Sequence, residues 1–323
     1  MTRKHRLFAL ARWIFFGASA LYLANFARRT LIGHDFRSLF TPTICAHTAI
    51  AACLFALTTA FSVIGWRALL AALQQPTRIR AAAAVFCYTQ IGKYLPGNIG
   101  HHIGRTALAK TRLGISAGTS VISITQEAVL VSLSAVIVGL SCYSLPIVGN
   151  RLHLPIAVPP GLLLGVVVGM FILFVAMVNA RRPRGLSTTN HVVRFAVHVT
   201  PTWGAIRATI PYYICLYFIN GIAVLLIAAT AMDTTAGTFI TLSGAYSISW
   251  VVGFLLPGAP GGLGVRESAF TLLLADAYPP DVILMVILLA RIATVCADFL
   301  VFLVGSFLMK WTPPVAFPNQ PIS

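Results

Sequence analysis

Long apolar runs dominate this chain, and several of them contain no charged residue. Uncharged stretches extend over residues 43–66, 154–180, 208–232 and 234–265. A run of about 18 or more apolar residues is typical of a helix that crosses a membrane. The pattern predicts an all-α polytopic membrane protein, with six spanning helices at residues 7–26, 43–70, 116–140, 156–179, 208–231 and 282–309.

Two further apolar segments, residues 81–110 and 239–275, are each interrupted near the middle by Pro-Gly. Both contain the pattern Leu-Pro-Gly-x-x-Gly-x-x-x-x-Arg, which begins at Leu95 in the first segment and at Leu256 in the second, 161 residues later. Proline and glycine interrupt helices, and helix breaks at matching points of two halves are typical of a transporter binding site. We therefore expect the two segments to be the centres of two structural repeats.

The distribution of basic residues predicts how these segments meet the membrane, because cytoplasmic loops carry an excess of Lys and Arg. If both Pro-Gly segments are re-entrant hairpins and the N-terminus is cytoplasmic, the five arginines within residues 181–207 lie in the cytoplasm. If the first segment crossed the membrane instead, those arginines would face outward. The charge pattern therefore favours re-entrant hairpins and places both termini in the cytoplasm.

Two spanning helices, a hairpin and a third spanning helix give three crossings in each half. The second half is then upside down relative to the first. The sequence predicts a single membrane domain, residues 1–323, composed of a first repeat at residues 1–150 and an inverted second repeat at residues 151–323. Inverted repeats with broken helices are common in secondary transporters, and their irregular backbone lies inside the protein or beside a water-filled cavity.

The composition excludes several other classes of protein. The chain is 58% hydrophobic and 9% charged, with a mean hydropathy of +0.87, and it has no polar stretch long enough for a separate soluble domain. Its net charge is +16, but the basic residues cluster at predicted helix ends, where anionic lipid headgroups and not nucleic acid are the expected partners. The few acids are widely spaced, so we expect no enzyme activity, no cofactor and no metal site.

Charged residues within the apolar segments are the candidate functional residues, because burying a charge in a membrane is costly. The predicted substrate-binding set combines them with the helix breaks and consists of Lys93, Pro96, Gly97, Gly100, Arg105, Pro257, Gly258, Gly261, Arg266 and Glu267. Arginine suits bidentate contacts to phosphate, so the cations would receive an anionic headgroup. The alternative is that these charges form internal ion pairs or snorkel to the membrane interface.

Three further charges, Glu127, Arg291 and Asp298, are candidates for ion pairs or a proton relay. Arg291 and Asp298 are seven residues apart and lie on one helix face. The repeat offset maps Glu127 onto residue 288, one turn before Arg291. We therefore expect Glu127 and Arg291 to pair, or to share a polar cluster.

The two motifs carry a resemblance to a known family. Residues 90–97, Gln-Ile-Gly-Lys-Tyr-Leu-Pro-Gly, and residues 256–267, Leu-Pro-Gly-Ala-Pro-Gly-Gly-Leu-Gly-Val-Arg-Glu, resemble signatures of the lysylphosphatidylglycerol synthase transmembrane-domain family of flippase-like membrane proteins. The helix order also fits, so the resemblance covers the whole chain. It implies a bacterial inner-membrane protein that moves a lipid between leaflets. Because the acyltransferase domain that makes lysyl-phosphatidylglycerol is lacking, the chain resembles the stand-alone members.

These features together predict a transporter that moves an anionic or phosphate-linked lipid by alternating access between the two hairpins. Aminoacylated phospholipids, polyprenyl-phosphate-linked sugars and hopanoid-type lipids are candidate substrates. Two alternatives remain open: a transporter of a small anionic solute, coupled to protons through Glu127, and an accessory membrane subunit of a lipid or glycan synthase. The expected partners are membrane phospholipids or a lipid-linked substrate, with a homo-oligomer or a synthase partner as further options.

Overall fold

The fold is helical throughout the part of the chain that the computed structural model describes, residues 41–95, 99–145, 159–181, 199–255 and 260–315. In chain order the elements are α2 (Pro42–Ala72), α3 (Ile79–Thr89), η2 (Gln90–Tyr94), α4 (Gly100–Leu113), α5 (Ala117–Ser144), α6 (Pro160–Arg181), α8 (Trp203–Ala228), α9 (Ala236–Leu255), η5 (Pro260–Gly262), α10 (Val265–Leu274) and α11 (Pro280–Met309). These residues contain no strand, which confirms the predicted all-α class.

Six of these helices, α2, α5, α6, α8, α9 and α11, are long and apolar enough to cross a membrane, so the chain is a multi-pass membrane protein. At 1.5 Å per residue, about 20 residues match the hydrocarbon thickness of a bilayer. Five of the six coincide with predicted spans, whereas the predicted span at residues 7–26 lies outside the described residues. The remaining one, α9, belongs to the second Pro-Gly segment. It is 20 residues long because it ends at Leu255, just before the Pro-Gly pair of that segment.

Short polar residues begin three of the long helices. Thr41, Ser116 and Thr202 precede α2, α5 and α8, and the side chain of each accepts a hydrogen bond from the backbone N–H three residues later. Such caps satisfy donors that the start of a helix leaves unpaired. Gly114 follows α4 with a φ of 71°, a left-handed conformation that glycine adopts at little cost. Local sequence thus sets the ends of the helices that frame the site.

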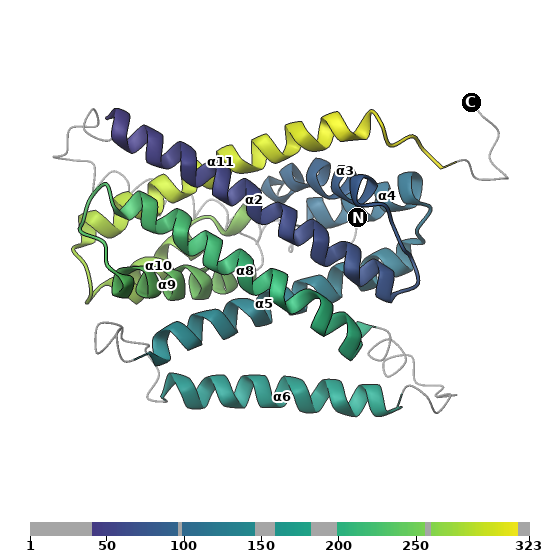
Figure 1. The fold of residues 1–323 in the computed structure, drawn as a ribbon, viewed down its shortest axis with the longest axis horizontal. Coiled ribbons are helices and arrows are strands. Elements are labelled where there is room, and N and C mark those ends of the chain that lie inside the picture. The colour runs from purple at the N-terminus through teal and green to yellow at the C-terminus, as the bar shows by residue number, and fades with distance from the viewer. Residues whose placement is uncertain (1–40, 96–98, 146–158, 182–198, 256–259, 316–323) are drawn as a thin grey trace, which may run out of the picture.

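The order of the elements repeats along the chain. The series α2, α3, η2, α4 and α5 is followed, after α6, by α8, α9, η5, α10 and α11. The packing repeats as well, because α2 contacts its counterpart α8, and the contact of α3 with α11 is matched by that of α9 with α5. In Figure 1, α2 and α8 run in opposite directions, and so do α5 and α11. An inverted repeat requires this arrangement, while the orientation of each half in a membrane stays a prediction.

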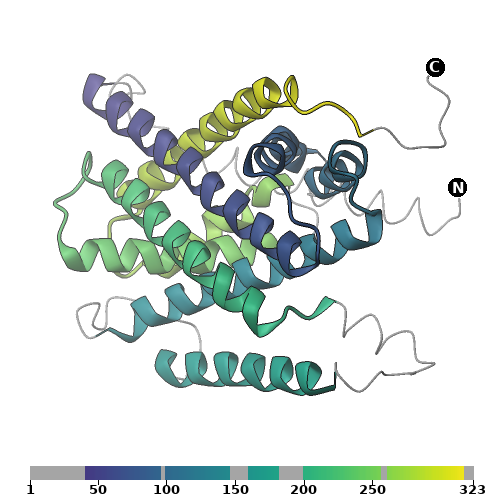
Figure 2. The same cartoon turned by 45° about the vertical axis from the view of Figure 1, so that its right-hand side comes forward.

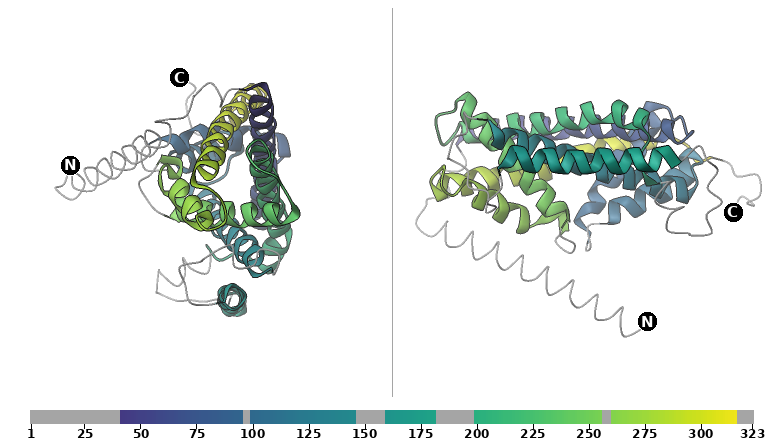
Figure 3. Two further views of the ribbon diagram at one scale, coloured as in Figure 1. Left: turned by 90° about the vertical axis from the view of Figure 1, so that its left-hand side faces the viewer. Right: turned by 90° about the horizontal axis from the view of Figure 1, so that it is seen from below.

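The two Pro-Gly segments form helix pairs whose inner ends meet. The pair α3 and α4 lies at one end of the molecule and the pair α9 and α10 at the other, and their inner ends approach each other midway along its length (Figure 3, right). There η2 contacts η5. Helices α3, α4 and α10 have 11, 14 and 10 residues, which is too short to cross a bilayer. Re-entry of the two pairs from opposite membrane faces stays a prediction.

Large buried side chains hold the long helices around this meeting point. Trp66, Tyr213, Tyr217 and Tyr246 are among the largest fully buried residues. The Trp66 Nε1–H group donates a hydrogen bond of 3.0 Å to Ser123 Oγ, which joins α2 to α5. Helix α6 stands apart on the outside of the bundle, against α5 (Figures 2 and 3). Only 6% of its most apolar window is buried, and α6 contributes little to the core beyond Val175 and Phe171.

Candidate functional site

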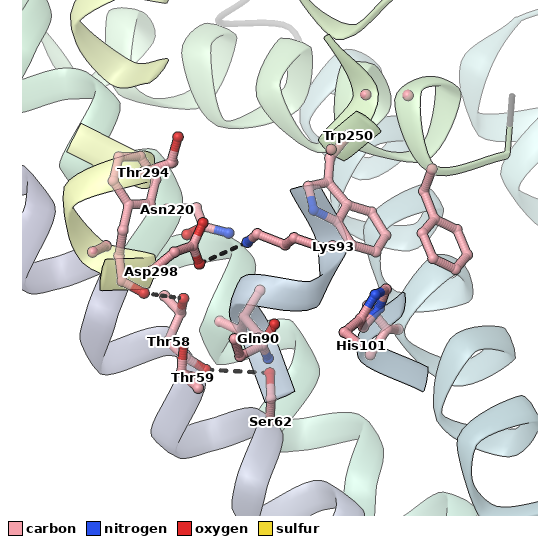
Figure 4. Close-up of a pocket in the computed structure, with 18 of the residues that line it drawn as sticks. Thr58, Thr59, Ser62, Gln90, Lys93, His101, Asn220, Trp250, Thr294 and Asp298 are labelled. Carbon is pink, nitrogen blue, oxygen red and sulfur yellow. Dashed lines mark hydrogen bonds and ion pairs between the residues drawn. The ribbon is translucent and has the colours of Figure 1, made fainter. Parts of the chain in front are cut away.

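A cavity of about 230 Å³ lies where the inner ends of the two helix pairs meet the long helices (Figure 4). Every described helix except α6 contributes to its lining. The charged residues of the lining, all singled out from the sequence, are Lys93, Arg105, Glu127, Arg266, Arg291 and Asp298. Four cations therefore face two carboxylates, and the cavity carries an excess of positive charge.

Arg105 of α4 is buried and fully compensated. Its side chain is 2% exposed and forms an ion pair with Glu127 of α5. Its guanidinium carbon lies 3.8 Å from the Phe86 ring centroid and 5.3 Å from that of Trp66. Aromatic faces attract cations, and a carboxylate partner removes much of the cost of burying charge. Arg105 thus has the surroundings of a structural ion pair at the cavity wall.

Arg266 of α10 occupies the matching motif position, but its surroundings differ. Its guanidinium carbon lies 4.0 Å from the ring centroid of Tyr246 on α9, much as Arg105 lies over Phe86 on α3. Within the described part of the chain, no carboxylate forms an ion pair with Arg266. The two motif arginines, equivalent in sequence, therefore differ in charge compensation. Among the described residues of the cavity wall, Arg266 is the cation without a carboxylate partner.

Glu267 and Arg291 hold the turn of the second helix pair. Glu267 Oε2 accepts a hydrogen bond of 2.6 Å from the Gly264 backbone N–H at the start of α10. Arg291 of α11 places Nε 3.6 Å from Glu267 Oε1 and donates from Nη2 to the Gly261 carbonyl at 2.9 Å. Gly261, Gly262 and Gly264 have φ values of 58°, 72° and 83°, which favour glycine. Glu267 therefore positions the turn and does not face the cavity as a ligand.

The expected direct pair between Glu127 and Arg291 is not the one that the structure forms. Glu127 pairs with Arg105, and Arg291 pairs with Glu267, although Glu127 and Arg291 line the same cavity. The repeat offset gives the depth of a residue along its helix, but not the direction of its side chain. Each charge is instead neutralised within its own half, by the motif segment next to it.

Lys93 joins the two halves directly. Its Nζ lies 2.6 Å from Asp298 Oδ1 on α11, and the Tyr94 hydroxyl donates to Asp298 Oδ2 at 2.5 Å. The Lys93 side chain is 29% exposed and that of Asp298 10%, so the contact faces the cavity. Figure 4 shows Lys93 reaching across the cavity to Asp298. The sequence did not predict this contact of Tyr94, because nothing in its surroundings along the chain indicates a partner some 200 residues away.

Uncharged polar side chains complete the lining. Asn220 of α8 is 5% exposed, and Gln90 of η2 is half-buried. Neither amide makes a hydrogen bond within the described residues. Thr58, Thr59 and Ser62 line the wall that α2 contributes. Sequence reasoning missed this group, although an asparagine inside a long uncharged apolar run is itself a signal.

The motif glycines and prolines are only partly described. Gly100 packs closely, because a Cβ there would lie 2.5 Å from the Gly92 carbonyl oxygen, so η2 and α4 can approach only without a side chain. Gly261 lies at the cavity wall in a left-handed conformation. The predicted site residues that lie outside the described residues are Pro96, Gly97, Pro257 and Gly258.

Comparison with known families agrees with the fold and the motifs. Residues 8–305 match the family described as Lysylphosphatidylglycerol synthase TM region. The match covers most of the 323 residues, so the chain belongs to this family. No curated protein shows a significant match. The family places the chain among membrane proteins related to lipid handling.

Proposed function

We propose that this member of the lysylphosphatidylglycerol synthase TM region family moves a lipid with an anionic headgroup between the leaflets of the bacterial cytoplasmic membrane. The observation that carries the proposal is the cavity at the meeting point of the two helix pairs, where four cations face two carboxylates. The headgroup binds in this cavity, and the protein acts without a chemical step. Both chain termini face the cytoplasm.

The charge distribution supports binding of a phosphate. Isolated cations are costly within a membrane, so an uncompensated arginine there indicates a ligand that supplies negative charge. Arg266 lacks a carboxylate partner in the described part of the chain and lines the cavity. Its planar guanidinium can donate two parallel hydrogen bonds to a phosphate. We assign Arg266 as the main phosphate ligand, with Lys93 as a second cation that Asp298 holds near the site.

Exposed apolar side chains beside the cavity favour a lipid over a soluble solute. Leu95 and Ile99 flank the first break, with exposures of 57% and 55%, and Leu255 precedes the second with 65%. Ile103 of α4 is 62% exposed. These side chains lie at the inner ends of the helix pairs and can contact acyl chains while the headgroup occupies the polar cavity.

The contact of Lys93 and Tyr94 with Asp298 gives alternating access a structural basis. It bridges η2 in one half and α11 in the other, so movement of the halves relative to each other stretches it. Alternating access in inverted-repeat transporters moves one bundle against another around a fixed site. A phosphate that binds near Lys93 competes with Asp298 for its charge and weakens the bridge. Substrate binding and rearrangement are thereby coupled.

A vesicle assay tests this proposal. The purified protein is reconstituted with phosphatidylglycerol labelled on an acyl chain, and an impermeant quencher reports how fast label leaves the inner leaflet. Wild-type protein should move the lipid, and Arg266→Gln should slow it about 10- to 150-fold, because a charge-assisted hydrogen bond contributes about 1.5–3 kcal/mol. Arg207→Gln is the matched control, since Arg207 is an exposed cation at the start of α8, outside the cavity lining.

Two results would contradict the proposal. One is lipid movement no faster than in protein-free vesicles, and the other is equal movement by wild type and Arg266→Gln. Uptake of radiolabelled glycerol phosphate by the same vesicles, without lipid movement, would support transport of a small anionic solute instead.

A further inference from the structure

The cavity is lined by uncharged polar side chains as well as by cations, and phosphate binding does not explain the uncharged ones. Gln90 and Asn220 project into the same space as Lys93 (Figure 4). They come from η2 and from the middle of α8, on different walls. Phosphate only accepts hydrogen bonds, and the arginine side already supplies donors. Each amide also has a carbonyl oxygen, however, and a phosphate has no donor to satisfy it.

Asn220 is the strongest indication of that second part. It is 5% exposed within a long apolar helix, and its amide makes no hydrogen bond within the described residues. Buried polar groups are nearly always paired, and an unpaired amide at a cavity wall indicates a partner that binds there. An amide donates and accepts at the same time, as a hydroxyl group does. Gln90 offers the same combination from η2.

Hydroxyl groups on α2 add acceptors to this side. Thr58 Oγ1 donates to the Phe55 carbonyl at 2.7 Å, and Ser62 Oγ donates to the Thr58 carbonyl at 3.4 Å. Because their hydrogens are used within the helix, the oxygens can offer only lone pairs to a ligand. A ligand hydroxyl can donate to such an oxygen and accept from an amide N–H.

The carboxylates of the site, in contrast, are all occupied. Glu127 pairs with Arg105, and Asp298 accepts from both Lys93 and Tyr94. Glu267 is engaged by Arg291 and by the backbone of the turn. A lysyl or ethanolamine headgroup would bring an ammonium group among four cations. Where a phosphate weakens the Lys93 contact, Asp298 still accepts a hydrogen bond from Tyr94, so the described site offers no free carboxylate to that ammonium. The electrostatics disfavour an amine-bearing headgroup.

From these observations we infer that the transported lipid carries a phosphate joined to an uncharged polyol, such as glycerol or a sugar, and not an aminoacyl or amine group. The phosphate binds at Arg266, and the polyol hydroxyls bind between Gln90, Asn220 and the hydroxyls of α2. The inference rests on the proposed function and specifies its substrate class.

The test compares short-chain lipids that differ only in the headgroup. Binding to the purified full-length protein in detergent is measured by calorimetry for phosphatidylglycerol and phosphatidylinositol, which carry polyols, and for phosphatidic acid, which carries phosphate alone. Lysyl-phosphatidylglycerol and phosphatidylethanolamine supply the amine. The polyol lipids should bind about tenfold or more tightly than the other three. Phosphatidic acid and phosphatidylethanolamine lack the headgroup hydroxyls that the site is built for, and lysyl-phosphatidylglycerol brings an ammonium group among cations. Equal or tighter binding of lysyl-phosphatidylglycerol overturns the inference.

The variant Asn220→Leu tests whether the amide side chains cause the preference for polyol headgroups. Asn220→Leu should weaken phosphatidylglycerol binding about tenfold and leave phosphatidic acid within about twofold of wild type, because only the polyol contact is lost. Asn179→Leu, at the end of α6 and outside the cavity lining, should leave the ratio of the two affinities unchanged. The ratio is internal to each variant, so a partly unfolded sample does not alter it. An equal loss for both lipids shows that Asn220 is structural and overturns the inference.

The vesicle assay distinguishes a wrong substrate class from a wrong proposed function. If lysyl-phosphatidylglycerol moves faster than phosphatidylglycerol, this inference is wrong and the proposed function stands. If none of the five lipids moves, the proposed function is wrong and this inference is wrong with it.

Discussion

Glu127→Gln should destabilise the protein strongly, because it leaves Arg105 as an uncompensated buried cation. The Arg105 side chain is 2% exposed and that of Glu127 9%, so water cannot replace the lost carboxylate. At a charge separation of about 4 Å and an effective dielectric constant of about 20, the attraction is about 4 kcal/mol. Breaking a buried pair by removing one partner typically costs about 3–5 kcal/mol.

The surroundings of Arg105 refine this figure. The rings of Phe86 and Trp66 remain in Glu127→Gln, and a desolvated cation–π contact contributes about 2 kcal/mol or more. The glutamine oxygen can still accept one hydrogen bond. We therefore expect the free energy of unfolding to fall by about 3 kcal/mol. In the double variant Arg105→Met with Glu127→Gln no charge remains, and the loss should be about 1 kcal/mol.

Equilibrium unfolding in mixed detergent micelles measures these differences. The four proteins of the cycle give a coupling energy, which should exceed about 2 kcal/mol. Asp233→Asn is the control, since Asp233 is an exposed carboxylate in the connection between α8 and α9 and its loss should change stability by less than about 0.5 kcal/mol. Additivity of the two single changes within about 0.5 kcal/mol would refute the assignment of Arg105 and Glu127 as a structural pair.

Three further predictions address packing, the Asp298 contacts and topology. Gly305→Val should lower the midpoint of thermal unfolding by several degrees or prevent folding, because a Cβ there would lie 2.7 Å from the Cys87 carbonyl carbon on α3. A midpoint equal to that of the wild type would contradict this close packing. Asp298→Asn should lower the midpoint more than Tyr94→Phe, which loses one hydrogen bond of about 1 kcal/mol, and the reverse order would show that the lysine contact contributes little. In a cysteine-free background, Asp276→Cys should react with an impermeant maleimide from outside the cell, and labelling only from the cytoplasm would rule out the inverted repeat.

The helices and the location of the site could be predicted from the sequence, because each depends on local composition. Uncharged runs define the spanning helices, and the two Pro-Gly pairs lie between η2 and α4 and between α9 and η5, where the described helices end. Charged side chains are costly to bury in a membrane, so they are expected to line a polar cavity inside the protein. Lys93, Arg105, Arg266 and Arg291 line one such cavity.

The pairing of those charges could not be predicted in the same way. The side chain of Arg105 reaches Glu127 because of the angle between α4 and α5, and Arg291 reaches Glu267 because three glycines shape the turn before α10. Neither the angle between these helices nor the shape of this turn can be deduced from the spacing of residues in the sequence. The role of Asn220 likewise depends on which face of α8 meets the cavity, and a single asparagine in an apolar run does not define that face.

The contact between Lys93 and Asp298 has a consequence for synthesis of the protein. The two residues are 205 positions apart, so at about 5–20 residues per second the ribosome needs roughly 10–40 s to produce α11 after η2. During that interval Lys93 lacks the carboxylate that neutralises it. A nascent chain that stops before α11 never acquires the Asp298 carboxylate, so Lys93 keeps an uncompensated charge. The contact between Lys93 and Asp298 can therefore form only after the last helix has been synthesised.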